Sequence, residues 1–222
     1  MFIQFLVEDQ SGEKLVNAVM DKYKLEQHDA TIEYRIKSYK GLGGLKKGPD
    51  AQSIKSSHLL TELPKRMCAI SNELRYVENA AIFIILDNDN RNTDAFSKQL
   101  YDVAQRNKIT ADHVFCIAVE EMEAWLLGDR QAIMNAYPKV RSRIEAKYNN
   151  YRQDSICGTW EFLADMLTKS GLSKFKKDNP TTMDVGKCKS EWAENIGNYL
   201  EIRANNSPSF NCFIGELDKR VC

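Results

Sequence analysis

The 222-residue sequence has few of the features that indicate a metal-thiolate site, a disulfide framework or a membrane anchor. Its six cysteines never form a Cys-x-x-Cys pair, which argues against structural zinc and against a disulfide framework. Its three histidines lie far apart, so a histidine-based metal site is not expected. The longest apolar run, Ala80 to Leu86, is far shorter than the ~20 residues that cross a bilayer. We therefore expect a cytoplasmic protein with reduced thiols and no contact with a membrane.

Net charge is also absent, because 31 basic side chains balance 31 acidic ones. This balance excludes a uniformly basic protein that binds nucleic acid by bulk charge. Two segments are acidic: residues 1–34 hold three basic and seven acidic side chains, and residues 76–135 hold five basic and ten acidic ones. The other two are basic: residues 35–75 hold nine basic and three acidic side chains, and residues 136–222 hold fourteen basic and eleven acidic ones. The charge is therefore sorted along the chain, which leaves room for an acidic site flanked by basic segments that hold a phosphate backbone.

Hydrophobic patterning predicts an α/β protein. Hydrophobic residues make up 43% of the chain and charged residues 28%, which is typical of globular proteins. Short apolar or alternating runs that are typical of strands are separated by helical patterns, which favours crossover connections and a mostly parallel, Rossmann-like sheet flanked by helices. We expect a core over residues 1–135 and a helical C-terminal extension over residues 136–222 that packs on it. The expected strands are Phe2–Val7, Thr31–Tyr39, Ala80–Leu86 and His113–Val119, and the expected helices are one capped by Ser11, then Ile54–Tyr76, Thr93–Lys108 and Glu120–Leu127.

Carboxylates follow three of the four expected strands. They form the runs Glu8-Asp9, Asp87-Asn-Asp89 and Glu120-Glu121-Met-Glu123. Because ligand sites of parallel sheets form at the carboxyl ends of the strands, we expect these side chains to meet at one edge. Crowded carboxylates repel one another, and hard divalent cations relieve that repulsion. The pattern predicts a site for Mg²⁺ or Mn²⁺.

Each of these residues also has a purely structural interpretation. A single carboxylate after a strand is commonly a turn former or a helix N-cap. For the late Ser207-Pro-Ser-Phe210 segment we expect an N-cap of a terminal helix, with contact to the site as the alternative. For Trp125, Trp160 and Trp192 we expect core packing, with stacking on nucleobases as the alternative.

The strand ending in Glu8 and the apolar strand ending in Asp87-x-Asp89 resemble the Toprim domain of topoisomerases, primases and overcoming-lysogenisation-defect nucleases. A closer resemblance is to a Toprim-like bacterial family related to anti-phage effectors of the PARIS type. The segments that carry it extend over nearly the whole chain, and Glu-Ala-Trp is the most specific part of them. They are Val7-Glu8 with Glu13, Lys40-Gly41, Asp87-x-Asp89, the run from Ala118 to Asp129, and Ser207-Pro-Ser-Phe210.

The resemblance implies roles for individual residues. Glu8 matches the Toprim glutamate, which is assigned to proton transfer or metal contact, and Asp87 and Asp89 match the metal-binding pair. Glu13 resembles a second glutamate of the nuclease subgroup. The sequence departs from the pattern after Glu8, where Asp9 replaces the usual glycine and Glu13 lies one residue late. Glu13 is therefore either a metal ligand or a helix cap.

The later acidic ligand of the nuclease subgroup is matched by Glu120 or Glu123. The catalytic set implied by the resemblance is Glu8, Asp87, Asp89 and Glu120, and the metal ligands are these four with Glu13 and Glu123. The resemblance also implies two ions of Mg²⁺ or Mn²⁺.

Lysines are the candidates for holding a phosphate substrate. Lys40, Lys46 and Lys47 lie in a Gly-rich loop that is open to phosphate, although it is not a P-loop. Lys187 and Lys189 are further candidates, although a solvated helix surface is the favoured interpretation of both. The expected function is a metal-dependent Toprim-type nuclease that cleaves DNA or RNA, tRNA included, as an anti-phage effector. An ABC- or SMC-type ATPase is the partner implied by the resemblance, and a homodimer stays open.

Two alternatives remain for the function. One is a catalytically weak regulatory module of an ABC-type ATPase, and the other is a metal-dependent nucleotidyl or phosphotransfer enzyme.

Overall fold

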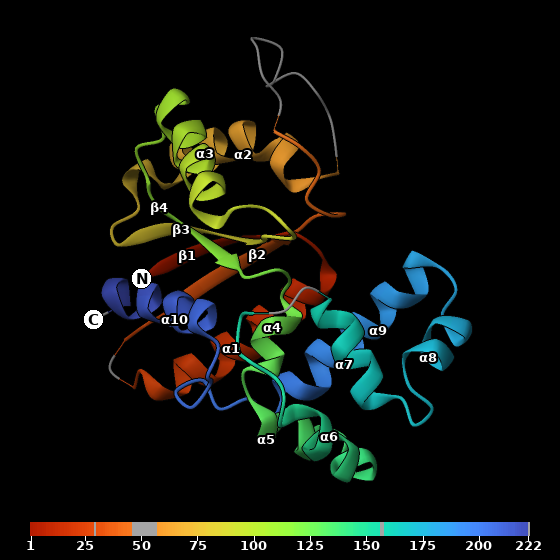
Figure 1. The fold of residues 1–222 in the computed structure, drawn as a ribbon. Helices are drawn as coiled ribbons and strands as arrows, with labels where there is room; N and C mark the ends of the chain where they lie inside the picture. Colours follow the sequence, from red (N-terminus) through yellow and green to blue (C-terminus); the bar gives the residue numbers. More distant parts are fainter. Residues whose placement is uncertain (29, 46–56, 156–157, 222) are drawn as a thin grey trace.

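The computed structural model describes residues 1–28, 30–45, 57–155 and 158–221. These residues form a four-stranded sheet in which every neighbouring pair is parallel. The strand order is β2-β1-β3-β4 (Figure 1). The predicted α/β class with a parallel, Rossmann-like sheet is therefore confirmed. The strands are β1 (Phe2–Val7), β2 (Glu33–Ser38), β3 (Ala80–Asp87) and β4 (Asp112–Ala118).

Burial separates the central strands from the edge strand. Strand β3 is buried at every position after Ala80, as its unbroken apolar run predicts for a strand covered on both faces. Strand β2 alternates between exposed and half-buried residues and pairs only with β1. The alternation at period two identifies a strand with one wet face.

The two faces of the sheet are covered by different helices. Helices α2 (Leu59–Glu73) and α3 (Thr93–Arg106) pack on the face that presents Ile82, Ile84 and Leu86 of β3. Alternate residues of the same strand face a larger core that includes α1 (Gln10–Glu26) and α10 (Pro208–Val221). Figure 1 shows these two layers on either side of the sheet.

The C-terminal half contributes most of its helices to the larger core. Tyr23 of α1, Trp192 of α9 and Phe213 of α10 all belong to this one cluster of buried residues. Gly197 allows a close approach between helices, since a Cβ there would lie 2.8 Å from the Cβ of Ala18 on α1. The boundary expected near residue 135 remains a prediction. The helices of this half are α4 (Glu123–Leu127), α5 (Arg130–Ala136), α6 (Arg141–Tyr148), α7 (Thr159–Leu167), α8 (Leu172–Asp178) and α9 (Thr182–Gly197).

Three helix starts differ from the sequence prediction. Helix α2 begins at Leu59, whereas its predicted start at Ile54 lies outside the described residues. Helix α1 is capped by Asp9 instead of Ser11, because the Asp9 carboxylate accepts a hydrogen bond from the Gly12 amide at 2.8 Å. Helix α4 begins at Glu123, three residues later than predicted, because Glu120 has a positive φ of 68°. Across the described ranges, no helix has the length and apolar character needed to span a membrane.

The Glu-Ala-Trp segment and the Ser-Pro-Ser-Phe segment, far apart in sequence, meet in the core. The indole Nε1 of Trp125 donates to the Ser209 hydroxyl at 2.9 Å, and the Trp125 ring stacks on Phe213 with centroids 5.2 Å apart. The Ser207 hydroxyl accepts from the Phe210 amide at 3.2 Å, which confirms the predicted N-cap of α10. Core packing is likewise confirmed for Trp125, which is fully buried.

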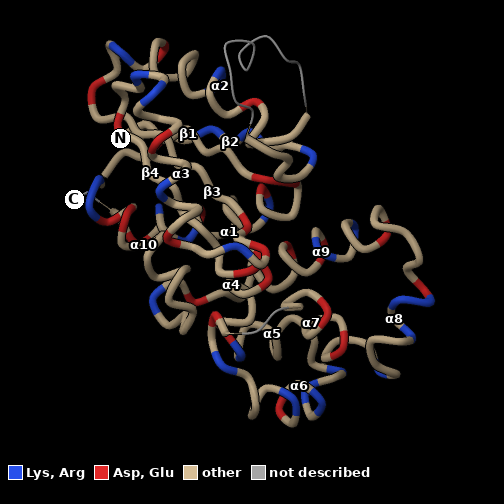
Figure 2. Tube along the Cα trace, turned by 45° about the horizontal axis from the view of Figure 1, so that its top comes forward, with Lys and Arg blue, Asp and Glu red and all other residues tan. Residues whose placement is uncertain are grey.

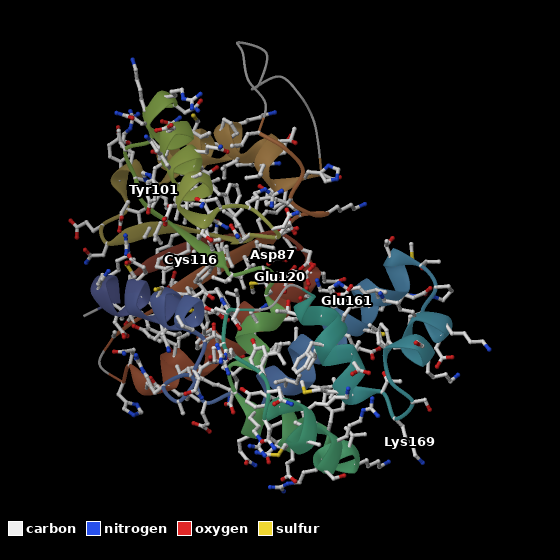
Figure 3. All side chains as sticks on the ribbon, in the orientation of Figure 1. Asp87, Tyr101, Cys116, Glu120, Glu161 and Lys169 are labelled. Atoms are coloured by element: carbon white, nitrogen blue, oxygen red, sulfur yellow. The ribbon has the colours of Figure 1, made fainter. Side chains whose placement is uncertain are left out.

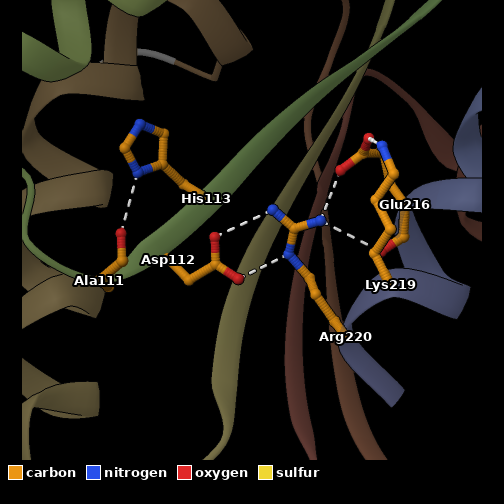
Figure 4. Close-up of polar contacts among 6 residues, drawn as sticks. All are labelled: Ala111, Asp112, His113, Glu216, Lys219 and Arg220. Atoms are coloured by element: carbon orange, nitrogen blue, oxygen red, sulfur yellow. Dashed lines mark hydrogen bonds and ion pairs between the residues drawn. The ribbon is translucent and has the colours of Figure 1, made fainter. Parts of the chain in front are cut away.

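A polar network joins the other end of α10 to the sheet (Figure 4). The Arg220 guanidinium donates to both carboxylate oxygens of Asp112, at 2.6 and 2.9 Å. It also donates to the Glu216 carboxylate at 2.5 Å and lies 5.5 Å from the centroid of the Phe83 ring. This two-point pairing fixes α10 against the start of β4.

Replacement of Gly128 by alanine should destabilise the fold. The added Cβ would overlap the side chain of Asn205, whose Nδ2 donates to the Trp125 carbonyl at 2.8 Å. Overpacking of this kind costs about 1–3 kcal/mol. Gly215 of α10 is the matched control, because a Cβ there meets no atom within 4 Å. Gly215→Ala should stabilise by about 0.5–1 kcal/mol through helix propensity. Urea unfolding measures both variants, and unchanged stability of Gly128→Ala would contradict the interlocking of these segments.

Candidate functional site

The ends of β1 and β3 bring two carboxylates together, as the sequence predicts. The Asp87 amide donates to the Glu8 carboxylate at 3.2 Å. The Asp87 carboxylate in turn accepts from the Met122 amide at 2.9 Å, and its residue is only 7% exposed. Figure 3 shows Asp87 at the end of the sheet that faces α4 and α7. Residues from two adjacent parallel strands therefore define one acidic centre at the carboxyl edge.

Asp9 adds a third carboxylate next to Glu8. Its side chain caps α1 and accepts from the Ser11 hydroxyl at 2.7 Å. Its negative charge contributes to the raised pKa of both Glu8 and Asp87. The cap thus fixes a charge beside the acidic centre.

Two more carboxylates and one ammonium group come from the segment before α4, from α4 itself and from α9. The Lys189 Nζ lies 3.0 Å from Glu123 and 3.6 Å from Glu121. Glu123 is 1% exposed, and the Lys189 side chain is 14% exposed. Within the described part of the chain, the facing carboxylate oxygens of Glu121 and Glu123 have no hydrogen-bond partner beyond this ion pair. We call Glu8, Asp9, Asp87, Glu121, Glu123 and Lys189 the acidic cluster.

Burial and mutual repulsion raise the pKa values in the acidic cluster. Burial raises the pKa of Glu8 to about 7, with further contributions from Asp9 and Asp89. Burial and the charge of Glu8 raise the pKa of Asp87 well above its usual range. Burial also raises the pKa of Glu121 to about 8 against the opposing effect of Lys189. Glu8 and Glu121 therefore exchange protons with solvent near neutral pH.

Lys189 stays charged despite its burial. Burial alone would lower the pKa of its ammonium, but the charges of Glu123, Asp87, Glu121 and Asp9 together raise it above its usual value. Acidic segments gather around the junction of β3, α1 and α4 in Figure 2. The ammonium is thus an internal counter-ion for the cluster, and the favoured interpretation of a solvated helix surface is wrong for this residue.

Glu120 does not join the acidic cluster. Its carboxylate accepts from the backbone amides of Gly158 and, at 2.7 Å, Thr159. It therefore binds the start of α7, where free amides and the helix dipole favour a negative charge. The positive φ of Glu120 turns its side chain away from the helical face it was predicted to share with Glu123.

Asp89 and Glu13 lie at the margin of the site. Asp89 is exposed, has a positive φ of 49° and forms an ion pair with Arg91. Its charge still contributes to the raised pKa of Glu8. Glu13 accepts from the Ser38 hydroxyl at the end of β2. Glu13 is not the cap of α1, and its role as a ligand stays a prediction.

The predicted phosphate-binding lysines are dispersed. Lys40 is exposed next to Gly41, whose amide donates to the Glu8 carbonyl at 3.0 Å, so this part of the loop borders the acidic cluster. Lys187 is exposed on α9. Lys46 and Lys47 lie outside the described residues. Lys189 faces carboxylates instead of open solvent.

The acidic cluster offers carboxylate oxygens as its donor groups. Carboxylate oxygens are the groups that Mg²⁺ and Mn²⁺ prefer. Over the ranges that the structure describes, however, no three His, Cys, Asp or Glu side chains are arranged to hold a metal ion. Lys189 lies among the carboxylates, so a bound cation requires their rearrangement around it.

Comparison with known protein families assigns the chain. A family model described as a domain of unknown function (DUF4276) matches residues 7–218. The chain belongs to the DUF4276 family. No curated protein and no solved structure matches it. The DUF4276 match runs from the end of β1 to the last turns of α10, so it includes every residue of the acidic cluster.

Replacement of Glu8 by glutamine should stabilise this DUF4276 protein at high pH. The folded pKa of about 7 lies above the usual 4.5, so the stability linked to the Glu8 proton is full below pH 4.5 and is lost as the pH rises through 7. Glu8→Gln removes that loss. The free energy of unfolding of Glu8→Gln should exceed that of wild type by about 1–3 kcal/mol above neutral pH, since one pKa unit is roughly 1.4 kcal/mol.

Chemical unfolding with EDTA across this pH range measures the effect. Glu33→Gln, at an exposed position of β2, is the control and should differ from wild type equally at both ends of the range. A pH-independent difference for Glu8→Gln would contradict the protonated state of the acidic cluster.

Proposed function

We propose that this protein is a divalent-metal-dependent nuclease of Toprim type that hydrolyses phosphodiester bonds. The observation that carries the proposal is the hydrogen bond from the Asp87 amide to the Glu8 carboxylate, which links two adjacent strand ends and leaves their carboxylates close enough to repel each other. Asp9, Glu121 and Glu123 increase the negative charge at the same edge. A surplus of buried carboxylates at the carboxyl edge of a parallel sheet is typical of a ligand site and is costly in a purely structural role.

The protein's own groups have defined tasks in this proposal. Glu8, with a pKa of about 7, is suited to accept a proton from a water nucleophile at neutral pH. Asp87 is held in one orientation by the Met122 amide. The Lys189 ammonium offsets negative charge on a phosphodiester as that charge increases in the transition state. Lys40, beside the site in an exposed loop, is available to the flanking phosphate.

Glu8, Asp87 and Asp89 are the residues that would hold the metal, with Glu123 as the later acidic ligand. A bound Mg²⁺ or Mn²⁺ would supply Lewis-acid activation and charge neutralisation. Glu120 is left out of this set, because its carboxylate is already bound by the amides at the start of α7.

One observation favours a second candidate function. The ion pairs of Lys189 with Glu121 and Glu123 neutralise part of the cluster without a metal. This arrangement suits a catalytically weak regulatory module that binds an ABC-type ATPase, the partner implied by the Toprim resemblance. The two proposals differ in whether a divalent cation binds.

The nuclease proposal predicts metal-dependent cleavage. Plasmid DNA and total tRNA should be cut in Mg²⁺ or Mn²⁺ and left intact in EDTA. Asp87→Asn should lower the rate by at least about 100-fold, because loss of one preorganised electrostatic group costs that much. Asp94→Asn, at an exposed position in the first turn of α3, is the matched control and should cut like wild type. Cleavage that persists in Asp87→Asn or in EDTA would overturn the proposal.

Divalent cations should also stabilise the protein. At 100 times its dissociation constant a ligand adds about 2.7 kcal/mol, which raises the melting temperature. Lys189→Met should be less stable than wild type in EDTA, because a buried ion pair that loses one partner costs roughly 3–5 kcal/mol. It should also gain more from Mn²⁺, since the competing ammonium is gone. Thermal unfolding with and without Mn²⁺ measures both effects, and the absence of any shift would favour the regulatory module.

A further inference from the structure

A groove of about 490 Å³ opens directly beside the acidic cluster. Asp9 and Lys189 of the cluster line its inner end, and Trp160 of α7, Lys176 of α8 and Val185 of α9 line the rest. Its volume is in the range of sites that bind small molecules. The groove therefore adjoins the proposed catalytic centre and, apart from Asp9, is lined by residues of the C-terminal part of the chain.

Trp160 presents an accessible ring in this groove. It is only half-buried, whereas Trp125 is fully buried and Trp192 is 5% exposed. Behind it the ring contacts Phe175 at a centroid distance of 6.2 Å, and Phe175 contacts Trp192 at 5.5 Å. These ring contacts hold Trp160 in place as a platform. Core packing alone does not require a tryptophan ring at the wall of a groove.

A cation lies over the Trp160 ring, and the Glu161 carboxylate is 3.8 Å from that cation. The Lys176 ammonium is 5.4 Å from the ring centroid, and its side chain is 53% exposed. A lysine on its flexible stem is readily displaced from such a position. Lys174 and Lys177 lie near Lys176 in sequence on α8, where Figure 2 shows basic segments, and Lys174 forms an ion pair with Asp178.

We propose that this groove binds one nucleotide of a single-stranded nucleic acid, with its base stacked on Trp160 and its phosphate on Lys176. The base takes the place of the ammonium over the ring, and the ammonium moves to the backbone phosphate. An aromatic platform combined with a basic rim is the usual means of holding single strands. The inference rests on the proposed nuclease function. It adds that the substrate is a strand with unpaired bases next to the acidic cluster.

Tryptophan fluorescence tests the inference on the intact protein. The sequence has three tryptophans, and the burial of the other two makes Trp160 the one that a bound base quenches. A short phosphorothioate-linked single strand, which resists hydrolysis, should quench the emission saturably in Mg²⁺. An abasic strand of the same length should not. Absence of saturable quenching, or equal quenching by the abasic strand, would overturn the inference.

Binding of a labelled strand, followed by fluorescence anisotropy, provides the second measurement. Trp160→Leu keeps an apolar side chain against Phe175, and its fold is checked by thermal unfolding. It should weaken binding about tenfold, within the range for loss of one base-stacking contact. Lys176→Gln should weaken binding about threefold and reduce its salt dependence. Lys98→Gln, an exposed lysine of α3 on the other side of the sheet, should bind like wild type.

The two proposals fail separately. If wild type cleaves nucleic acid and Trp160→Leu binds with unchanged affinity, the groove assignment is overturned and the nuclease stands. If no metal-dependent cleavage occurs but Trp160 is quenched and Trp160→Leu binds weakly, the groove assignment is supported and the hydrolytic function is overturned.

Discussion

Lys189 holds its ammonium 3.0 Å from the carboxylate of Glu123, and both groups are withdrawn from solvent. Removal of two charges from water costs several kcal/mol each, so neither group is tolerated there without the other. The pair joins α9 to α4. Helix α9 also packs closely on α1, whose cap is Asp9. The position of α9 therefore determines the electrostatics at the end of the sheet. Sheet and helical segment therefore share one charge balance as well as one hydrophobic core.

Helix α4 contributes both to this charge balance and to the hydrophobic core. The helix has five residues and is buried along its whole length. Glu123 faces Lys189, while Trp125 two residues later stacks on Phe213 and donates to Ser209. Much of the specificity of the Glu-Ala-Trp segment thus has a packing explanation. The interlocked α4 and α10 set the orientation from which Glu123 reaches the acidic cluster.

The sequence predicted the sheet and the meeting of Glu8 with Asp87, because both depend on local information. Unbroken apolar runs identify buried parallel strands, and parallel strands end at one edge. The contacts of Glu120 and Lys189 depend on partners that are distant in the chain. Glu120 binds the amides of Gly158 and Thr159, 38 and 39 residues later. Helical periodicity gives Lys189 no distinguishing mark from an exposed lysine such as Lys187, and only the packing of α9 reveals its partners.

The charge balance also constrains what the acidic cluster can do. With pKa values of about 7 for Glu8 and about 8 for Glu121, the cluster changes its proton content close to neutral pH. Protons, the Lys189 ammonium and any divalent cation compete for the same carboxylates. Binding of a divalent cation would therefore release protons and weaken the ion pairs of Lys189 with Glu121 and Glu123. Since Lys189 also lines the groove beside Trp160, a change in its pairing would alter the charge that a bound strand meets. Under the two proposals, substrate binding and cation binding would be coupled through one side chain of α9.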